Sequence, residues 1–336
     1  MAGKRWAVAV HGGAGTEVPA SKDAEDALYG GLNIALAAAE AILSNANMPA
    51  VYCGAPRHLA AAVAAVEALE ANPLYNAGTG AVLNNEGVVE NEASLMDGAT
   101  LRIGAVTGLS TVVYPIRLAL LVHLKAPNKF IGFRFAEKYA DLYPGLIERR
   151  PNETFITEKR RAAQQRAAQA ASLRGAQEVG DVVGNTVGAV VFDAAGGGSV
   201  ACATSTGGVT NKMAGRIGDT PVVGAGSYAA NGICAISGTG MGEEFLRLSA
   251  ASRICGMMEY GKLSLRESMH RVVHDRFPPD TGGFIGVDSE GQIVMDANSA
   301  YMARASSDSE GNRFAGPQDV ILHYGLRPVF LSCLFF

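Results

Sequence analysis

Apolar positions divide the chain into two blocks of regular elements, and a polar segment at about residues 148–184 separates the blocks. In the first block, apolar residues recur every three or four positions after Ser21 and again at about residues 57–70, which predicts two helices with one buried face each. A shorter apolar helix is expected at about residues 115–124. Continuous apolar runs in the same block predict strands at residues 5–10, 80–83 and 101–106.

The second block begins at residue 186 and is richer in strands. Its patterns predict helices at about residues 243–260 and 264–276 and strands at 187–193, 199–204, 221–226, 232–237, 283–288 and 292–296. Because the strands follow one another in short-turn pairs and the helices are grouped, we expect mainly antiparallel sheets with helices outside, an α+β fold. The polar segment is linker-like, can form an exposed helix at residues 158–177, and is the natural place for a cut in the chain.

Composition narrows the class of protein. With 336 residues, 48% of them hydrophobic and 18% charged, the chain can bury a large core as one domain or as two intimately packed halves. A net charge of −4 is unlike that of nucleic-acid binders, which concentrate Lys and Arg on one face, so we expect a small-molecule partner. The N-terminal residues lack an apolar signal region, and we expect neither a membrane span nor any compartment other than the cytoplasm.

Cysteines and histidines give no sequence sign of a metal centre. The five cysteines form no CxxC or Cys/His cluster and are expected to be small buried residues: Cys53, Cys202, Cys234, Cys255 and Cys333. Five histidines show no spacing that suggests a metal and are expected in the core or at the surface: His58, His123, His270, His274 and His323. A glycine-rich turn is expected at residues 11–15 after the first strand, but it matches no phosphate-binding motif, so His11 is expected to be structural.

The junction between the polar segment and the second block carries the most informative residue, Thr186, which lies within the sequence GNTVG at residues 184–188. If the bond between Asn185 and Thr186 breaks, Thr186 becomes an N-terminus with a hydroxyl nucleophile and an amine base on one residue. Such a residue needs only an oxyanion site and groups that hold the substrate. Thr186 could instead be an ordinary threonine at the start of a strand, where β-branched residues are common.

Residues that could supply these groups follow in glycine-rich loops. Hydroxyls, one arginine and one aspartate occur between residues 204 and 243, with Arg216 and Asp219 three positions apart. An arginine forks onto a carboxylate and an aspartate accepts from an ammonium, so this set suits a small zwitterionic substrate. Arg216 and Asp219 could alternatively pair with each other on a turn. Thr204 and Ser205 are expected to be structural.

The chain contains, in this order, HGGAG at residues 11–15, NAG at 76–78, MDG at 96–98 and the series from 186 to 243. Motifs in this order resemble the plant-type L-asparaginase/isoaspartyl peptidase family of N-terminal-nucleophile hydrolases, and the resemblance runs from residue 8 to about residue 291. It implies a four-layer αββα sandwich formed by one hydrolase domain, residues 1–336, that cuts itself into an α chain, 1–185, and a β chain, 186–336. It further implies hydrolysis of L-asparagine, β-aspartyl (isoaspartyl) dipeptides or both, by a homodimer of processed αβ units.

Site roles also follow from the resemblance. Thr186 is then the nucleophile, and Thr206 is the residue whose hydroxyl hydrogen-bonds it. The Thr239 hydroxyl and the Gly240 amide form the oxyanion hole. The resemblance assigns the substrate's α-carboxylate to Arg216 and its α-amine to Asp219 and the Gly242 carbonyl. No cofactor is implied for catalysis, but a structural sodium ion is, held by the backbone carbonyls of Leu69, Glu70, Asn72, Tyr75, Ala77 and Thr79.

Several residues depart from the family pattern. Asn185 stands where the family commonly has glycine and glycosylasparaginases have aspartate, and its carbonyl is the one attacked during self-cleavage, so slow or incomplete processing is expected. Gly238 replaces a larger residue, and Glu92 stands where aspartate is usual. The alternatives are a glycosylasparaginase-like hydrolase and a processing-impaired homologue that acts as a binding protein. The apolar tail at residues 326–336 either packs in a core or interface or is an atypical end.

Overall fold

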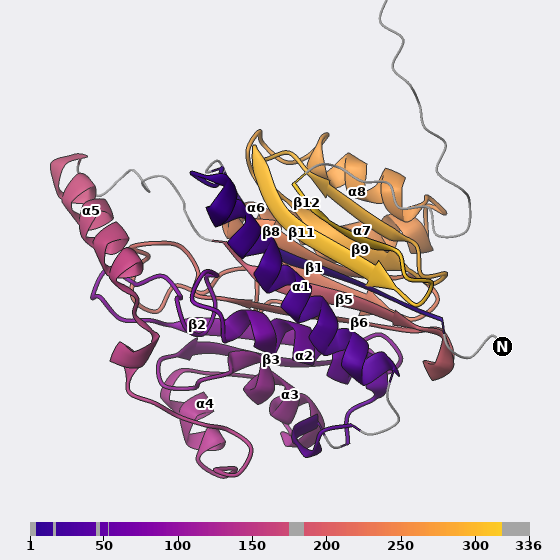
Figure 1. Cartoon of the computed structure of the whole chain (residues 1–336), viewed down its shortest axis with the longest axis horizontal. Helices are drawn as coiled ribbons and strands as arrows, with labels where there is room; N and C mark the ends of the chain where they lie inside the picture. Colours follow the sequence, from indigo (N-terminus) through magenta and orange to yellow (C-terminus); the bar gives the residue numbers. More distant parts are fainter. Residues whose placement is uncertain (1–4, 16–17, 45–47, 53, 175–184, 318–336) are drawn as a thin grey trace, which may run out of the picture.

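Two β-sheets and their covering helices make up the protein (Figure 1). A computed structural model describes residues 5–15, 18–44, 48–52, 54–174 and 185–317. In the larger sheet the strands pair in the order β12 (Arg313–Gly316), β11 (Tyr301–Asp308), β1 (Trp6–Gly15), β5 (Val187–Asp193), β6 (Ser199–Thr206), β2 (Asn91–Asp97), β3 (Arg102–Leu109) and β4 (Phe130–Gly132). Only the β3–β4 pair of this sheet is parallel. Strands β1 and β5, one from each block, pair antiparallel next to the centre of the sheet, which is the β5–β6 pair.

The smaller sheet is fully antiparallel and lies against one face of the larger one. Its strands pair in the order β10 (Ile293–Ala297), β9 (Gly282–Asp288), β8 (Cys234–Gly240) and β7 (Ser227–Ala230). Buried residues of β1 and β5, such as Ala9 and Val190, pack there with Ile285 and Val287 of β9. This apolar layer fixes the two sheets face to face.

Helices cover the outer faces of both sheets. The helices are α1 (Lys22–Ser44), α2 (Arg57–Glu70), α3 (Pro115–Lys125), α4 (Phe133–Ala140), α5 (Glu158–Arg174), α6 (Gly242–Leu248), α7 (Ala250–Glu259) and α8 (Leu265–Val273). The first three share a core with the large sheet, and α7 and α8 share one with the small sheet. By length and composition α1 could cross a membrane, but Leu32, Leu36 and Ala39 on it are buried in the core against α2 and β1.

The α+β class and the antiparallel pairing with helices outside are confirmed, as are the helices after Ser21, at 57–70 and at 115–124. The strands predicted at 80–83 and 221–226 do not form. Leu83 makes only an isolated bridge to Val89, because the backbone around it bonds to neighbouring loops. The single helix predicted at 243–260 is two helices, broken at Ser249, which has φ 47°.

The glycine-rich residues 11–15 are not a turn but the second half of β1. Register shifts between His11 and Gly13, so a β-bulge lies there and the strand continues to Gly15. In the polar segment, α5 occupies the expected exposed helix up to Arg174. Cys53, Cys333, His323 and the apolar tail lie outside the described residues, whereas Cys202, Cys234 and Cys255 are free and buried.

Candidate active site

Thr186 lies directly before β5, at the end of the central pair of strands, and is buried with 5% of its surface exposed. In β5 and β6 the antiparallel register pairs Val187 with Ser205. Continued by one residue, the same register would place Thr206 opposite Thr186. The Thr206 hydroxyl accepts a hydrogen bond from the amide of Gly208 at 3.0 Å, whereas the Thr186 hydroxyl makes no hydrogen bond to another described residue.

A chain of buried side chains holds the carbonyl of Thr186. His11 Nδ1 is 3.0 Å from this carbonyl oxygen, and His11 Nε2 is 2.8 Å from Ser237 Oγ, which is 2.9 Å from Thr204 Oγ1. Complete burial lowers the pKa of His11 to about 3, so the ring is neutral. A carbonyl can only accept, so Nδ1 donates to Thr186 and Nε2 accepts from Ser237. His11 is therefore structural, in a position that links both sheets to Thr186.

Asn185 packs directly against the bulge of β1. A Cβ atom at Gly13 would lie 2.2 Å from the Cβ of Asn185, and Gly13 has φ +120°, a conformation that other residues rarely adopt. Glycine is thus required on both counts. The carbonyl group that self-cleavage would attack therefore belongs to a residue in contact with the central strand.

Thr239 and Gly240 reach the same region from the smaller sheet. Thr239 is fully buried, and its hydroxyl accepts a hydrogen bond from the amide of Ala14 at 3.2 Å. Gly240, the last residue of β8, has φ +145°, and a Cβ there would lie 2.0 Å from the carbonyl oxygen of Thr281. The end of β8 is thereby fixed against β1.

The absence of a side chain at Gly238 has a packing explanation. A Cβ at this position would lie 2.4 Å from the ring of Phe245 and 2.7 Å from that of Phe284. These two rings pack with centroids 4.9 Å apart and fill the space that a larger residue at 238 would occupy. The sequence departure is therefore matched by aromatic side chains from α6 and β9.

Arg216 is held by a partner that the sequence did not indicate. Its Nη2 and Nε donate to one oxygen of Glu243, at 2.8 and 3.1 Å. The Arg216 side chain is mostly buried, with 15% exposed, whereas that of Glu243 is 61% exposed. The ion pair between Arg216 and Asp219 that the spacing allowed is not formed, and Arg216 turns toward the first turn of α6.

Asp219 is a buried carboxyl in a space bounded by two glycines. Cβ atoms at Gly226 and Gly242 would lie 2.6 and 2.5 Å from its carboxyl oxygens. Burial raises its pKa to about 7, and the charge on Arg216 opposes this rise. A cationic group placed beside Asp219 would favour its ionised form. The contact with Gly242 brings the start of α6 next to this carboxyl.

Two further buried charges support the loop that carries Arg216 and Asp219. Both oxygens of Glu92 accept from the amide of Gly218, at 3.2 and 3.1 Å, and Lys212 Nζ donates to the carbonyl of Glu90 at 2.8 Å. Burial raises the pKa of Glu92 and lowers that of Lys212, while their opposite charges counteract both shifts. Only long-range contacts reveal this role, since Gly218 is 126 residues from Glu92 in the chain.

The family follows from comparison with known proteins. The model of the asparaginase family matches residues 4–315. The chain belongs to the asparaginase family. It is 37% identical to the isoaspartyl peptidase/L-asparaginase of Homo sapiens over 330 residues, which cover 96% of each chain. It is 42% identical to the isoaspartyl peptidase of Escherichia coli over 247 residues, 72% of this chain and 76% of the relative.

A plant relative covers most of the chain as well: the probable isoaspartyl peptidase/L-asparaginase 2 of Arabidopsis thaliana is 35% identical over 332 residues, 91% of this chain and 97% of the relative. The resemblance seen in the sequence motifs is thus confirmed. In this asparaginase-family chain, Thr186 and Thr206 share one strand end, and Thr239 and Gly240 approach from the other sheet. Arg216, Asp219 and Gly242 form a second group joined by the start of α6.

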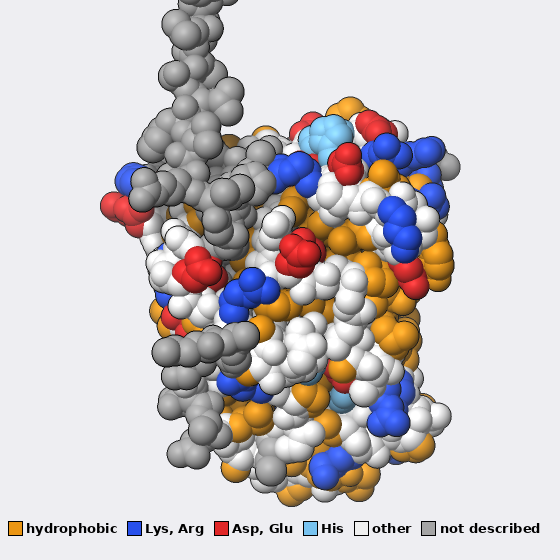
Figure 2. All heavy atoms as spheres, turned by 90° about the vertical axis from the view of Figure 1, so that its right-hand side faces the viewer, with side chains coloured by type: hydrophobic (Ala, Val, Ile, Leu, Met, Phe, Trp, Pro, Cys, Tyr) orange, Lys and Arg blue, Asp and Glu red, His pale blue; other side chains and the backbone are white. Residues whose placement is uncertain are grey.

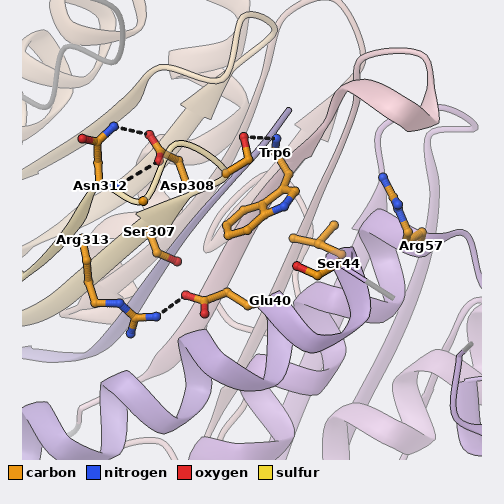
Figure 3. A pocket seen from close by; sticks show the side chains of 11 residues that line it. Trp6, Glu40, Ser44, Arg57, Ser307, Asp308, Asn312 and Arg313 are labelled. Carbon is orange, nitrogen blue, oxygen red and sulfur yellow. Dashed lines mark hydrogen bonds and ion pairs between the residues drawn. The ribbon is translucent and has the colours of Figure 1, made fainter. Parts of the chain in front are cut away.

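A polar cavity of about 480 Å³ lies elsewhere, between α1 and the β11–β12 hairpin (Figure 3). It is lined by Trp6 at the beginning of β1, whereas Thr186 is beside the end of that strand, near Gly13. Glu40 and Arg313 form an ion pair across it. The residues that line the cavity include none of the sequence-predicted site residues.

Replacement of Gly13 by alanine tests how Asn185, the residue expected to precede the cut, is held. The added methyl group would overlap Asn185 and the backbone would be strained, so we expect Gly13→Ala to abolish or greatly slow cleavage before Thr186. Gly30→Ala is a matched control, because a Cβ at Gly30 meets no atom within 4 Å. Cleavage is followed on denaturing gels. Wild-type cleavage in Gly13→Ala would contradict this role of the contact.

Proposed function

We propose that this protein is a self-processing amidohydrolase that releases L-aspartate from L-asparagine, β-aspartyl dipeptides or both, with Thr186 as nucleophile. Its relatives carry the names isoaspartyl peptidase and L-asparaginase. The observation that carries the proposal is the position of Thr186, buried at the start of a central strand, opposite Thr206 and beside the segment of β1 that contacts Thr239. A threonine that merely begins a strand would not need these neighbours.

Self-cleavage begins, in this proposal, when the Thr186 hydroxyl attacks the carbonyl carbon of Asn185. The peptide C–N bond breaks, the nitrogen takes up a proton, and the acyl group passes to the threonine oxygen as an ester. Water then hydrolyses the ester. The products are chain 1–185, which ends in a carboxylate, and chain 186–336, which begins with a free α-amine.

Substrate hydrolysis would use the same hydroxyl. The α-amine of Thr186, with an ordinary pKa of ~8, takes the hydroxyl proton as the oxygen attacks the substrate's side-chain carbonyl. The Thr239 hydroxyl and the Gly240 amide would stabilise the oxyanion, each by roughly 3 kcal/mol. The C–N bond breaks, ammonia or the amino compound leaves with a proton, and water releases L-aspartate from the acyl-enzyme.

Substrate orientation would depend on Arg216, Asp219 and Gly242. The Arg216 guanidinium would bind the α-carboxylate, and Asp219 with the Gly242 carbonyl would bind the α-ammonium. Support comes from the burial of both charged side chains and from the contact between Asp219 and Gly242. Because burial raises the pKa of Asp219, a bound ammonium beside the carboxyl would favour its ionised form.

Further proposals concern architecture and setting. We propose that the two sheets and their helices form the four-layer αββα sandwich of N-terminal-nucleophile hydrolases, supported by the apolar layer between the sheets and the helical cores outside them. We also propose a homodimer of processed αβ units in the cytoplasm. Sedimentation velocity on the processed protein separates this dimer from a single αβ unit.

A structural sodium ion is proposed for the loop after α2. Its ligands would be the backbone carbonyls of residues 69, 70, 72, 75, 77 and 79, hard oxygen donors that suit Na⁺. The carbonyls of Leu69, Glu70 and Asn72 each accept a backbone amide within the loop, and each keeps a second lone pair. Positive φ at Gly78 folds the loop back onto Glu70. The ion would hold this loop and take no part in the chemistry.

The proposed function is tested with wild type and Thr186→Ala. Wild type should release ammonia from L-asparagine or L-aspartate from a β-aspartyl dipeptide, while Thr186→Ala should stay one chain and fall below detection on both. A glycosylated asparagine as substrate detects the glycosylasparaginase alternative. Undiminished hydrolysis by Thr186→Ala would overturn the proposal, as would a folded wild type without activity on either substrate, the result expected of a binding protein.

The pH dependence of product binding tests the role of Asp219. We expect the affinity for L-aspartate, measured by calorimetry between about pH 5.5 and 8.5, to decrease below about pH 7, where Asp219 becomes protonated. The decrease should approach tenfold for each pH unit. The Asp219→Asn variant should bind L-aspartate weakly and should lack this pH dependence. An affinity that stays constant across the range in wild type would contradict an ionised Asp219 as the ammonium ligand.

The raised pKa of Asp219 also determines how this carboxyl affects stability as the pH changes. The pKa of Asp219 is raised from 3.8 to about 7 in the folded protein, which therefore holds a proton that the unfolded chain has released between these values. The contribution of this carboxyl to the free energy of unfolding thus decreases as the pH rises from about 4 to 7 and stays low above 7.

Glu243 competes with the substrate carboxylate for Arg216. Because its side chain is largely exposed, the pair is worth about 0.2–1 kcal/mol, and we expect Glu243→Gln to lower KM by up to about fivefold with kcat little changed. Steady-state kinetics measure this, with Glu244→Gln, the neighbouring residue that pairs with Arg247, as the control. A higher KM in Glu243→Gln would show that Glu243 positions Arg216 instead.

Replacement of Na⁺ by another cation tests the proposed sodium site in the loop after α2. An ion that binds only the folded state raises stability, so we expect a higher Tm in NaCl than in choline chloride at equal ionic strength. Scanning calorimetry of the processed protein gives both values. Equal Tm values in the two salts would contradict the proposed sodium site.

A further inference from the structure

We propose that His270, His274 and Asp296 form a binding site for a divalent transition-metal ion, with Zn²⁺ the best fit. The two histidines are four residues apart at the C-terminal end of α8, and the amide of His274 bonds to the carbonyl of His270 at 2.8 Å, so helical geometry extends to both. Residues at this spacing share one helix face. Asp296 lies on β10, which packs against α8. The sequence alone gave no sign of this cluster, because Asp296 is 22 residues from His274 in the chain.

Distances among the three side chains suit one ion. His274 Nε2 is 2.8 Å from Asp296 Oδ1, and His270 Nδ1 is 3.7 Å from Asp296 Oδ2. One ligand atom from each residue lies within 4.8 Å of the other two. A tetrahedral ion with bonds of about 2.0–2.1 Å separates its ligand atoms by about 3.4 Å, so small side-chain rotations bring all three to bonding distance.

Ligand chemistry selects the class of metal. Two imidazoles and one carboxylate suit Zn²⁺ and its neighbours in the first transition row, whereas Ca²⁺ and Mg²⁺ prefer oxygen ligands only. His270 and His274 are accessible, with 61% and 35% of their side chains exposed, so an ion can enter and keep a water molecule as fourth ligand. Figure 2 shows histidine side chains gathered at the surface beside acidic ones.

The site is separate from the proposed catalytic centre and would join β10 of the smaller sheet to α8, a helix that covers this sheet. Asp296 pairs with Phe284 on β9, which in turn pairs with Gly238 on β8, two strands away. A bound ion would add three bonds between α8 and β10 to the apolar packing that already joins them. We therefore expect metal binding to stabilise this layer without taking part in hydrolysis.

Competition between the processed protein and a chromophoric chelator for ZnCl₂ tests the site. Wild type should bind one Zn²⁺ ion more tightly, by ~tenfold or more, than the double variant His270→Gln/His274→Gln, and ZnCl₂ should raise the Tm of wild type only. Arg271→Gln, an exposed substitution on the same helix, is the matched control and should behave like wild type. X-ray absorption at the zinc edge should show nitrogen and oxygen ligands at about 2.0–2.1 Å.

Asp296→Asn gives an independent variant that keeps both histidines and should also weaken binding. Circular dichroism before metal addition checks that each variant is folded, and an unfolded double variant leaves Asp296→Asn to decide. Equal zinc affinity in wild type and the variants would overturn the proposal, as would sulfur ligands at the zinc edge. Neither outcome would affect the proposed hydrolysis, which is measured without added metal.

Discussion

Close contact between the two sheets at the end of strands β1, β5 and β8 is the constraint on which the site depends. The hydrogen bond from Ser237 on β8 to His11 on β1 crosses between the sheets, and a Cβ at Gly188 on β5 would lie 2.1 Å from Ser237 Oγ. Glycine at 188 is what lets the strands approach so closely. Thr186, two residues before Gly188, is thereby held at a junction that water enters poorly, with its carbonyl bonded to a neutral imidazole.

Burial of charge is the second consequence of this packing. Glu92 and Lys212 are buried beneath the 216–219 loop, and Asp219 is buried within it. Burial shifts the pKa of each of the three groups in the direction that favours its neutral form. Such groups destabilise a protein unless they have partners, and a substrate with one carboxylate and one ammonium would provide them for Arg216 and Asp219. A zwitterionic substrate, as proposed, would therefore be electrostatically complementary to these two side chains.

Sequence reasoning reached the fold class, the family and the helices of the first block, because periodic apolar stripes and local motifs are visible along a single chain. It missed β2, whose residues Asn91, Glu92 and Asp97 give a polar sequence, although all seven positions of the strand are buried. Polar side chains are buried there because partners distant in sequence satisfy them, as Gly218 does for Glu92. It also missed Glu243 as the partner of Arg216 and the pairing of two histidines with Asp296, since contacts between separate elements leave no local pattern.

Release of the amine at Thr186 is the central claim, and mass spectrometry of the intact protein during incubation tests it most directly. The account predicts that the mass of the 336-residue chain is replaced by two masses that correspond to residues 1–185 and 186–336, with activity appearing in step with cleavage. Full activity in the uncut chain, or activity after a cut at a bond other than 185–186, would contradict it.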